Sequence, residues 1–456
     1  MKSIFQNNYS RENFSQLIRN VYSNTYEALV HPEPIYDVDK SIAISAFRLG
    51  TIKLNDGNEI AVYETALASN CNLSRNRVGI RNLLRNSWKF YDGAFIASFK
   101  PNDSEWRFSF LSETKGFDDS GDYITQRTQT KRYTYLFGKE HPCRTAEERF
   151  TTLQTSERNL KSIIDAFSVE ALSKDFYKKL YNWYEWAMEK ETGVTFPDTS
   201  NSTAKEVEDM NVKIIRMITR ILFVWFIKQK ELVKDELFDE KELRNILRDF
   251  NPEATNCGNY YNAILQNLFF ATLNRAVIDE EGNPRRFANL KSKRDLRTLY
   301  RYEEMFQISE NEVIELFDKI PFLNGGLFEC LDKFKSIDIQ QETIYFDGFS
   351  RNDVCDSNGN YKYRAFVPNV LFFNTDETKD EKHLGLFQLL SQYNFTIEEN
   401  STDDAQVSLD PELLGRVFEN LLASYNPETQ ESARKSTGSF YTPREIVNYM
   451  VDESLV

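Results

Sequence analysis

The sequence predicts an α+β protein, with a mixed α/β domain at the N-terminus followed by a large, mainly helical region. From Ser41 to about Gly138, apolar and polar residues tend to alternate, as in strands that are buried on one side. Beyond about Thr145 the apolar residues instead recur with the 3.6-residue period of helices. The 456 residues include 35 Phe and 23 Tyr but only 17 Gly, which suits aromatic cores better than turn-rich or phosphate-cradling architectures.

The N-terminal domain is predicted to run strand, strand, helix, strand, strand. The first two strands are separated by the turn sequence Asn-Asp-Gly-Asn, which is typical of a hairpin. The helix is indicated by apolar residues at helical spacing. The predicted elements are, in order, the strands 46–54 and 59–65, the helix 75–88, and the strands 93–99 and 106–111.

Helices dominate the next part of the chain, where aromatic and aliphatic residues return every three or four positions. The predicted helices or helical blocks are 160–167, 176–186, 207–232, 260–273, 413–424 and 443–455. The polar stretch 192–203 is a predicted loop. We therefore expect a domain at 1–145, a helical connector at 146–430, and a further domain that starts at 431–456.

Composition narrows the class of protein. A formal charge of −14 excludes a uniformly basic nucleic-acid coat. Five isolated cysteines and three histidines make a disulfide framework or a zinc site unexpected. The first residues lack the apolar core of a signal peptide, and the most apolar stretch, Ile214 to Ile227, is short and interrupted by Arg216 and Arg220. We expect a cytoplasmic protein without a membrane span, and a buried helix at that stretch.

One run of basic residues stands out between Arg285 and Arg297. It holds six cations, Arg285, Arg286, Lys291, Lys293, Arg294 and Arg297, against the single acid Asp295. Such a run fits contact with DNA phosphates, and it equally fits a solvated surface. Both interpretations stay open on the sequence alone.

Four separated segments, taken in order, resemble the region that precedes the methyltransferase core in the Eco57I-like adenine-specific DNA methyltransferases of restriction-modification systems. The resemblance covers roughly Glu206 to Val456, and its last segment is the most specific. The segments are Arg220–Lys230 (RILFVWFIKQK), Ile320–Glu329 (IPFLNGGLFE), Leu409–Leu422 (LDPELLGRVFENLL) and Gly438–Val447 (GSFYTPREIV).

The resemblance implies transfer of a methyl group from S-adenosylmethionine to adenine N6 in double-stranded DNA, in restriction-modification or phage defence. It also implies that Phe440, Tyr441, Thr442 and Pro443 line the cofactor pocket, at the start of a Rossmann-like domain. The residues suit this role, because Thr442 is a natural helix cap with Pro443 at the first helical position. A helix N-terminus attracts a carboxylate such as that of the cofactor. Alone, the same residues would indicate an ordinary capped helix.

Two motifs that methyl transfer requires are absent from the 456 residues. There is no Gly-x-Gly for a cofactor turn and no Pro-Pro pair for a flipped adenine. We therefore expect the chain to be the N-terminal part of a longer enzyme or to act with a second chain, and to be inactive alone. The alternative is a non-catalytic DNA-binding or assembly subunit of a split methyltransferase.

A second hypothesis is a PD-(D/E)xK-like DNA endonuclease in the N-terminal domain. Such enzymes place carboxylates and a lysine on adjacent strands to bind Mg²⁺ and orient water. Asp92 opens one predicted strand, Glu113 and Lys115 close the next, and Glu64 lies on a neighbouring strand. Asp92 and Glu113 would then be the metal ligands. The alternative without nuclease function is that Asp92 forms a turn and that the Glu-x-Lys sequence occurs by chance in a highly charged chain.

Overall fold

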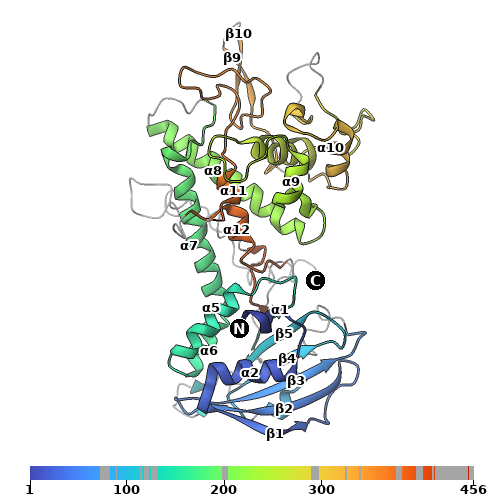
Figure 1. Ribbon diagram of the computed structural model, residues 1–456, viewed down its shortest axis with the longest axis vertical. Coiled ribbons are helices and arrows are strands. Elements are labelled where there is room, and N and C mark those ends of the chain that lie inside the picture. The colour runs from blue at the N-terminus through green and yellow to red at the C-terminus, as the bar shows by residue number, and fades with distance from the viewer. Residues whose placement is uncertain are drawn as a thin grey trace. The chain divides into compact units, whose positions relative to one another are not determined.

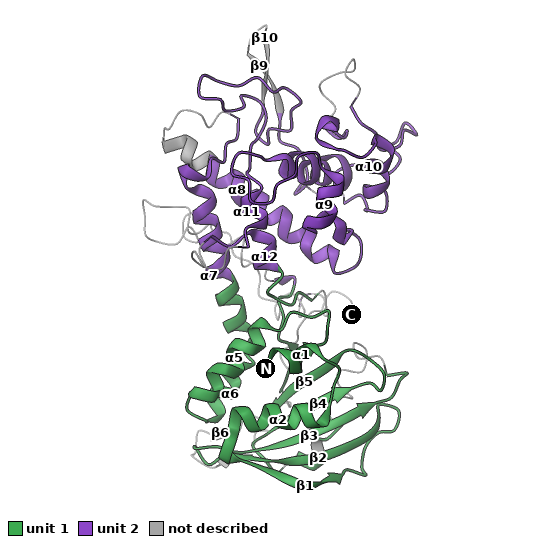
Figure 2. Cartoon of the chain, viewed as in Figure 1, with its two compact units in different colours: residues 1–176, 391–410 green, residues 177–390, 411–456 purple. Residues whose placement is uncertain are grey.

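The computed structural model confirms the α+β class and divides the chain into two units (Figures 1 and 2). Unit 1 consists of Met1–Phe176 and Ser391–Asp410, and unit 2 of Tyr177–Leu390 and Pro411–Val456. The residues described are 1–71, 83–88, 90–112, 116–117, 123–124, 131–197, 204–288, 297–323, 326–337, 340–375, 383–396, 404–412, 415 and 450.

Unit 1 is built on a seven-stranded mixed sheet of order β1-β2-β3-β4-β5-β8-β11. Two neighbouring pairs, β3 with β4 and β11 with β8, run parallel, and the other pairs are antiparallel. The strands are β1 Tyr26–Pro34, β2 Ala43–Lys53, β3 Glu59–Leu67, β4 Gly93–Phe99, β5 Trp106–Ser112, β8 Lys131–Phe137 and β11 Asp404–Gln406. All four predicted strands are confirmed. The parallel β3–β4 pair requires a crossover, and the predicted helix is present there as α4 Arg85–Trp88 within the described part.

Aromatic side chains on one face of this sheet form the core of unit 1. Successive strand residues point to opposite faces, so Phe108 and Phe110 of β5 share a face with Phe95 of β4. Phe108 stacks on Phe150 with ring centroids 5.4 Å apart, and Phe95 stacks on Phe167 at 5.9 Å. The covering helices are α2 Arg11–Tyr22, α5 Arg144–Thr155 and α6 Leu160–Ala166. The sheet therefore buries its phenylalanines beneath helices, as the composition suggested.

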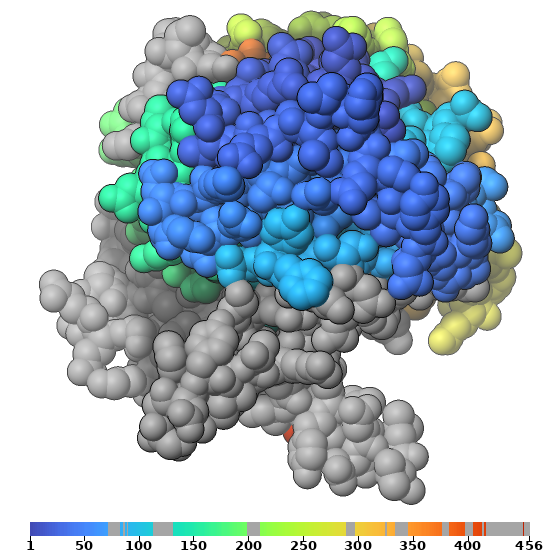
Figure 3. Space-filling model, turned by 90° about the horizontal axis from the view of Figure 1, so that it is seen from below, coloured from blue at the N-terminus to red at the C-terminus, as the bar shows by residue number. Residues whose placement is uncertain are grey.

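The two edge strands of the sheet, β1 and β11, are not among the strands that the sequence predicts. β1 carries Pro32 and Pro34, residues that strands tolerate at an edge because they cannot donate to a neighbour. Large apolar side chains are exposed nearby, with Val30 90%, Tyr36 86% and Ile44 55% exposed. At the other edge, β11 comes from the far end of the chain and pairs Ala405 with Tyr133 of β8. In Figure 3 the N-terminal part of the chain, blue to cyan, forms a continuous surface.

Unit 2 is mainly helical. Its central segment is η4, Tyr260–Leu273, a π-helix whose side chains are all buried. The predicted block 207–232 is α8 Ala204–Lys228, and the predicted block 176–186 falls within α7 Val169–Met188, which starts in unit 1. Within the described residues, the other helices of unit 2 are η2 Lys190–Thr192, η3 Asp235–Leu237, α9 Glu240–Ile246, η5 Glu303–Met305, α10 Glu310–Phe317, α11 Val370–Phe373 and α12 Leu386–Leu390. No helix in the described part of the chain combines the length and apolarity needed to cross a membrane.

Short elements make up the rest of the described secondary structure. In unit 1 these are α1 Lys2–Gln6, η1 Ser23–Thr25, β6 Gly116–Phe117 and β7 Tyr123–Ile124. In unit 2, β9 Lys333–Ile337 and β10 Gln340–Ile344 form an antiparallel pair. Asp332 lies directly before this pair and Asp347 three residues after it, so both stand at its base.

Candidate functional site

Glu64, one of the carboxylates of the nuclease hypothesis, is buried in β3 and already engaged. Its Oε2 accepts a hydrogen bond of 2.6 Å from the Tyr9 hydroxyl, and its Oε1 accepts one of 2.8 Å from Arg11 Nε. The Arg11 Nη2 also pairs with Oε1, and the guanidinium lies 5.0 Å from the centre of the Phe47 ring. The carboxylate raises the pKa of Arg11, and burial followed by Glu64 raises the pKa of Tyr9.

Asp92, the second predicted carboxylate, lies elsewhere on the sheet. Its backbone N–H donates a hydrogen bond to the Glu59 carbonyl, and its Oδ2 accepts one from the Glu59 N–H, both at 2.9 Å. Asp92 is thus held at Glu59, the first residue of β3, whereas Glu64 lies five residues further along that strand and pairs with Ala97 of β4. At a rise of ~3.3 Å per residue this is a separation of about 16 Å. The structure therefore does not bring Glu64 and Asp92 together.

The other members of the predicted nuclease site, Glu113 and Lys115, lie outside the described residues. The β4–β5 register pairs Gly93 with Ser112, the sequence neighbours of Asp92 and Glu113. Among the described residues, no group of three or more His, Cys, Asp or Glu could hold a metal ion. At Glu64 the donor set does not fit Mg²⁺, because a guanidinium already occupies the position of the cation.

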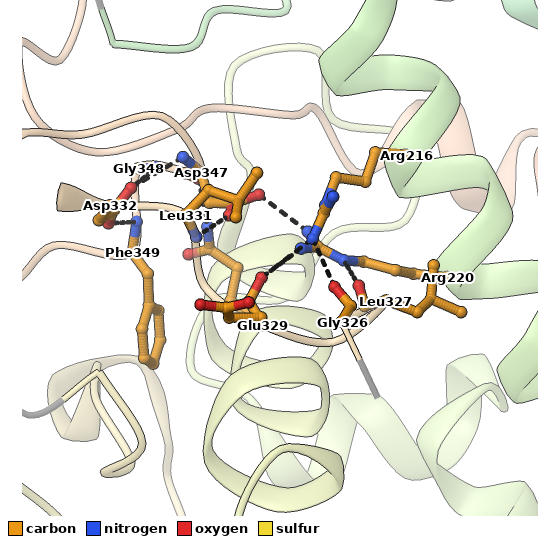
Figure 4. A network of polar contacts seen from close by, with 11 residues as sticks. Arg216, Arg220, Gly326, Leu327, Glu329, Leu331, Asp332, Asp347, Gly348 and Phe349 are labelled. Atoms are coloured by element: carbon orange, nitrogen blue, oxygen red, sulfur yellow. Dashed lines mark hydrogen bonds and ion pairs between the residues drawn. The ribbon is translucent and has the colours of Figure 1, made fainter. Parts of the chain in front are cut away.

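Unit 2 contains a buried polar network around Arg220 of α8, drawn in Figure 4. Arg220 is 1% exposed, and each of its guanidinium nitrogens donates a hydrogen bond. Nη1 donates to Asp347 Oδ1 at 2.8 Å, Nε to the Leu327 carbonyl at 2.8 Å, and Nη2 to the Glu329 carbonyl at 2.9 Å. Arg216, one helical turn earlier, donates to the Gly326 carbonyl at 2.8 Å. Two arginines of α8 thus hold the backbone of 326–329.

Two aspartates continue this network toward the base of the β9–β10 pair. Asp347 Oδ2 accepts the Leu331 N–H at 2.6 Å, and Asp332 accepts the N–H groups of Asp347, Gly348 and Phe349 at 2.8–3.1 Å. Burial, and next the neighbouring Asp347 carboxylate, raise the pKa of Asp332 to about 6, although the three N–H groups oppose this rise. We name the set Arg216, Arg220, Asp332 and Asp347 the arginine–aspartate clamp.

The basic run contains another buried arginine. Arg285 is 3% exposed, and its guanidinium donates to the carbonyls of Thr272 and Ile320 at 2.8 Å. It also donates hydrogen bonds to the carbonyls of Arg275 at 2.8 Å and Phe317 at 3.2 Å. These acceptors lie near the C-terminal ends of η4 and α10. Cations are favourable at helix C-termini, where carbonyls lack partners. Burial lowers the pKa of Arg285.

Arg285 therefore cannot contact DNA as the basic-run interpretation suggested. Its neighbour Arg286 is exposed and Arg297 is half-buried, whereas Lys291, Lys293 and Arg294 lie outside the described residues. The sequence offered no signal that separates adjacent Arg285 and Arg286. For Arg220 a signal existed, since an arginine inside an otherwise apolar helix needs buried partners.

The predicted cofactor residues Phe440, Tyr441, Thr442 and Pro443 also lie outside the described residues. Their assignment stays a prediction. The structure does connect two of the four segments that carry the family resemblance, because Arg220 opens the first and its hydrogen-bond acceptors Leu327 and Glu329 belong to the second.

Comparison with known proteins yields one informative relative. The chain is 24% identical over 361 residues to a protein of Methanocaldococcus jannaschii that bears the provisional name of type II restriction enzyme and methyltransferase. The similar region covers 76% of this chain and 23% of the relative, so the chain spans about a quarter of that protein's length. No protein-family model matches the chain, and no solved structure matches it significantly.

Proposed function

We propose that the protein belongs to a restriction-modification system and works in the methylation of double-stranded DNA. The observation that carries this proposal is the similarity to a protein named as a type II restriction enzyme and methyltransferase, which extends over three quarters of the chain. The family resemblance of the four sequence segments points the same way on separate grounds.

The geometry of unit 2 supports this proposal. The segments Arg220–Lys230 and Ile320–Glu329 are nearly a hundred residues apart in sequence, yet Arg220 binds the backbone of the second segment directly. A shared buried contact is a physical reason for both segments to occur together. We infer that the clamp forms a scaffold for the methyltransferase region, and that it takes no part in the chemistry.

The reaction we propose is methyl transfer from S-adenosylmethionine to adenine N6. Phe440, Tyr441, Thr442 and Pro443 would line the cofactor pocket, with the free N–H groups of a helix N-terminus facing the cofactor's carboxylate. The target adenine would have to leave the base stack, as in other enzymes that act on a base. The Gly-rich and Pro-Pro motifs would come from sequence other than these 456 residues, for example from a second chain. The biological role would be defence against phage.

Cofactor binding tests the site assignment without any need for catalysis. Titration with S-adenosylmethionine in a calorimeter should detect binding by the chain when it is assembled with the sequence that carries the Gly-rich motif. Tyr441→Ala should weaken that binding at least tenfold. The matched control Tyr36→Ala removes a tyrosine that is 86% exposed in unit 1 and should leave the affinity unchanged. Equal affinities for both variants would reject the assignment of Tyr441.

A further inference from the structure

The second face of the unit 1 sheet differs from the aromatic one, since polar side chains are buried on it. Thr65 of β3 pairs with Ser98 of β4, and Ser109 of β5 pairs with Thr134 of β8. Arg132, two residues before Thr134, shares their face. Each of these five side chains is at most 4% exposed. A sheet face with so many buried polar groups needs hydrogen-bond partners for them.

A small cavity lies against this face. Its polar wall is formed by Thr65, Ser98, Ser109 and Arg132, and its apolar wall by Leu83, Leu84, Ile96 and Leu111. The space open to the centre of a water-sized sphere is about 10 Å³. One water molecule needs about that much room and two to four polar partners, and the polar wall provides them.

Thr65 is the member of the polar wall that lacks a hydrogen-bond partner. The residue is fully buried, and its Oγ1 has no hydrogen-bond partner. By contrast, the Ser109 hydroxyl pairs with Thr134 Oγ1 at 2.8 Å. A buried hydroxyl without a partner is unfavourable, and valine would fill the same space without that cost. The buried Thr65 hydroxyl therefore needs a hydrogen-bond partner, and it stands at the wall of a cavity with further polar groups.

We propose that this cavity holds one ordered water molecule, hydrogen-bonded to Thr65 Oγ1 and to the other polar groups of the wall. The water supplies the partner that Thr65 Oγ1 lacks, on a sheet face that also carries the apolar cluster of Tyr63, Ile96 and Leu111. A dry cavity and a cavity that holds a small anion beside Arg132 are the two competing states.

The sign of one stability change separates a hydrated cavity from a dry one. If the water is present, Thr65→Val removes its hydrogen bond and lowers the thermal midpoint of unit 1 by roughly 2–4 °C. If the cavity is dry, the same substitution removes an unsatisfied group, and the midpoint stays or rises. The control Thr51→Val changes a half-buried strand threonine whose hydroxyl accepts only a 3.4 Å hydrogen bond from Arg48. It reports the effect of Thr→Val on strand propensity alone.

A high-resolution crystal structure of the full chain supplies the second test, which holds even if the variant fails to fold. We expect one density peak within hydrogen-bond distance of Thr65 Oγ1. An empty cavity would overturn the proposal. So would an anomalous peak at that position after a bromide soak, because it would identify an anion instead of water.

Discussion

Arg220 offers the sharpest test of the fold of unit 2. Arg220→Met keeps the length and apolar stem of the side chain but removes three hydrogen bonds and the partner of Asp347. Asp347 is 4% exposed, so its charge would remain in a low-dielectric surrounding without the guanidinium. Loss of one partner from a buried ion pair typically costs about 3–5 kcal/mol.

The second partner allows the cost to be dissected. Asp347→Asn removes the charge but leaves Arg220 its two carbonyl acceptors, so we expect a smaller loss, about 1–3 kcal/mol. In the double variant neither charge remains. The double loss should therefore fall short of the sum of the single losses by at least about 1 kcal/mol, which is the coupling energy of the pair.

Urea unfolding of the full chain, followed by circular dichroism and tryptophan fluorescence, measures these differences. For the Arg220→Met variant we expect the transition of unit 2 to shift to lower urea by roughly 1–2 M. A shift corresponding to less than about 1 kcal/mol, or strictly additive losses in the double variant, would refute the claim that the clamp holds unit 2 together.

Three further predictions concern other buried charges. The raised pKa of Asp332, about 6, lies above its unfolded value of about 4, so its contribution to stability is complete below pH 4 and is lost as the pH rises through 6. Unfolding measured from pH 4 to 7 should show this loss, about 3 kcal/mol, and Asp332→Asn should remove it. Arg285→Met should cost at least about 2 kcal/mol in urea unfolding, whereas Arg286→Met, one residue away and exposed, should stay within about 0.5 kcal/mol; equal costs would contradict the assigned burial. Glu64→Gln should lower the thermal midpoint of unit 1, and added Mg²⁺ should shift wild type and variant equally; a Mg²⁺ response lost only in the variant would identify Glu64 as a metal ligand and contradict its assignment to an ion pair with Arg11.

Local patterns predicted much of the fold. The strands 46–54, 59–65, 93–99 and 106–111 were recognisable because alternation is a property of neighbouring residues. The block 260–273 was recognised as helical for the same reason, although its π-helical hydrogen bonding was not. β11 was missed because it has only three residues and pairs with a strand some 270 residues earlier, and no local pattern encodes such a partner.

The candidate site was less predictable, for a related reason. Glu64 and Asp92 are both acidic, but Glu64 lies within β3 and Asp92 directly before β4, and the parallel register of the two strands places them at different heights on the sheet. Similarly, Arg285 and Arg286 are chemically identical in sequence, and only the tertiary fold directs one of them to helix C-termini. Charge alone indicates that a group needs a partner, whereas the register and the packing decide which partner it finds.

The central claim, that the protein works in adenine methylation of DNA, is tested most directly by the DNA of the cells that make it. Sequencing that detects N6-methyladenine should be applied to the source strain and to a strain that lacks this gene. We predict that the deletion abolishes N6-methyladenine at one recognised sequence and that restoring the gene brings it back. An unchanged methylation pattern in the deletion strain would contradict the claim.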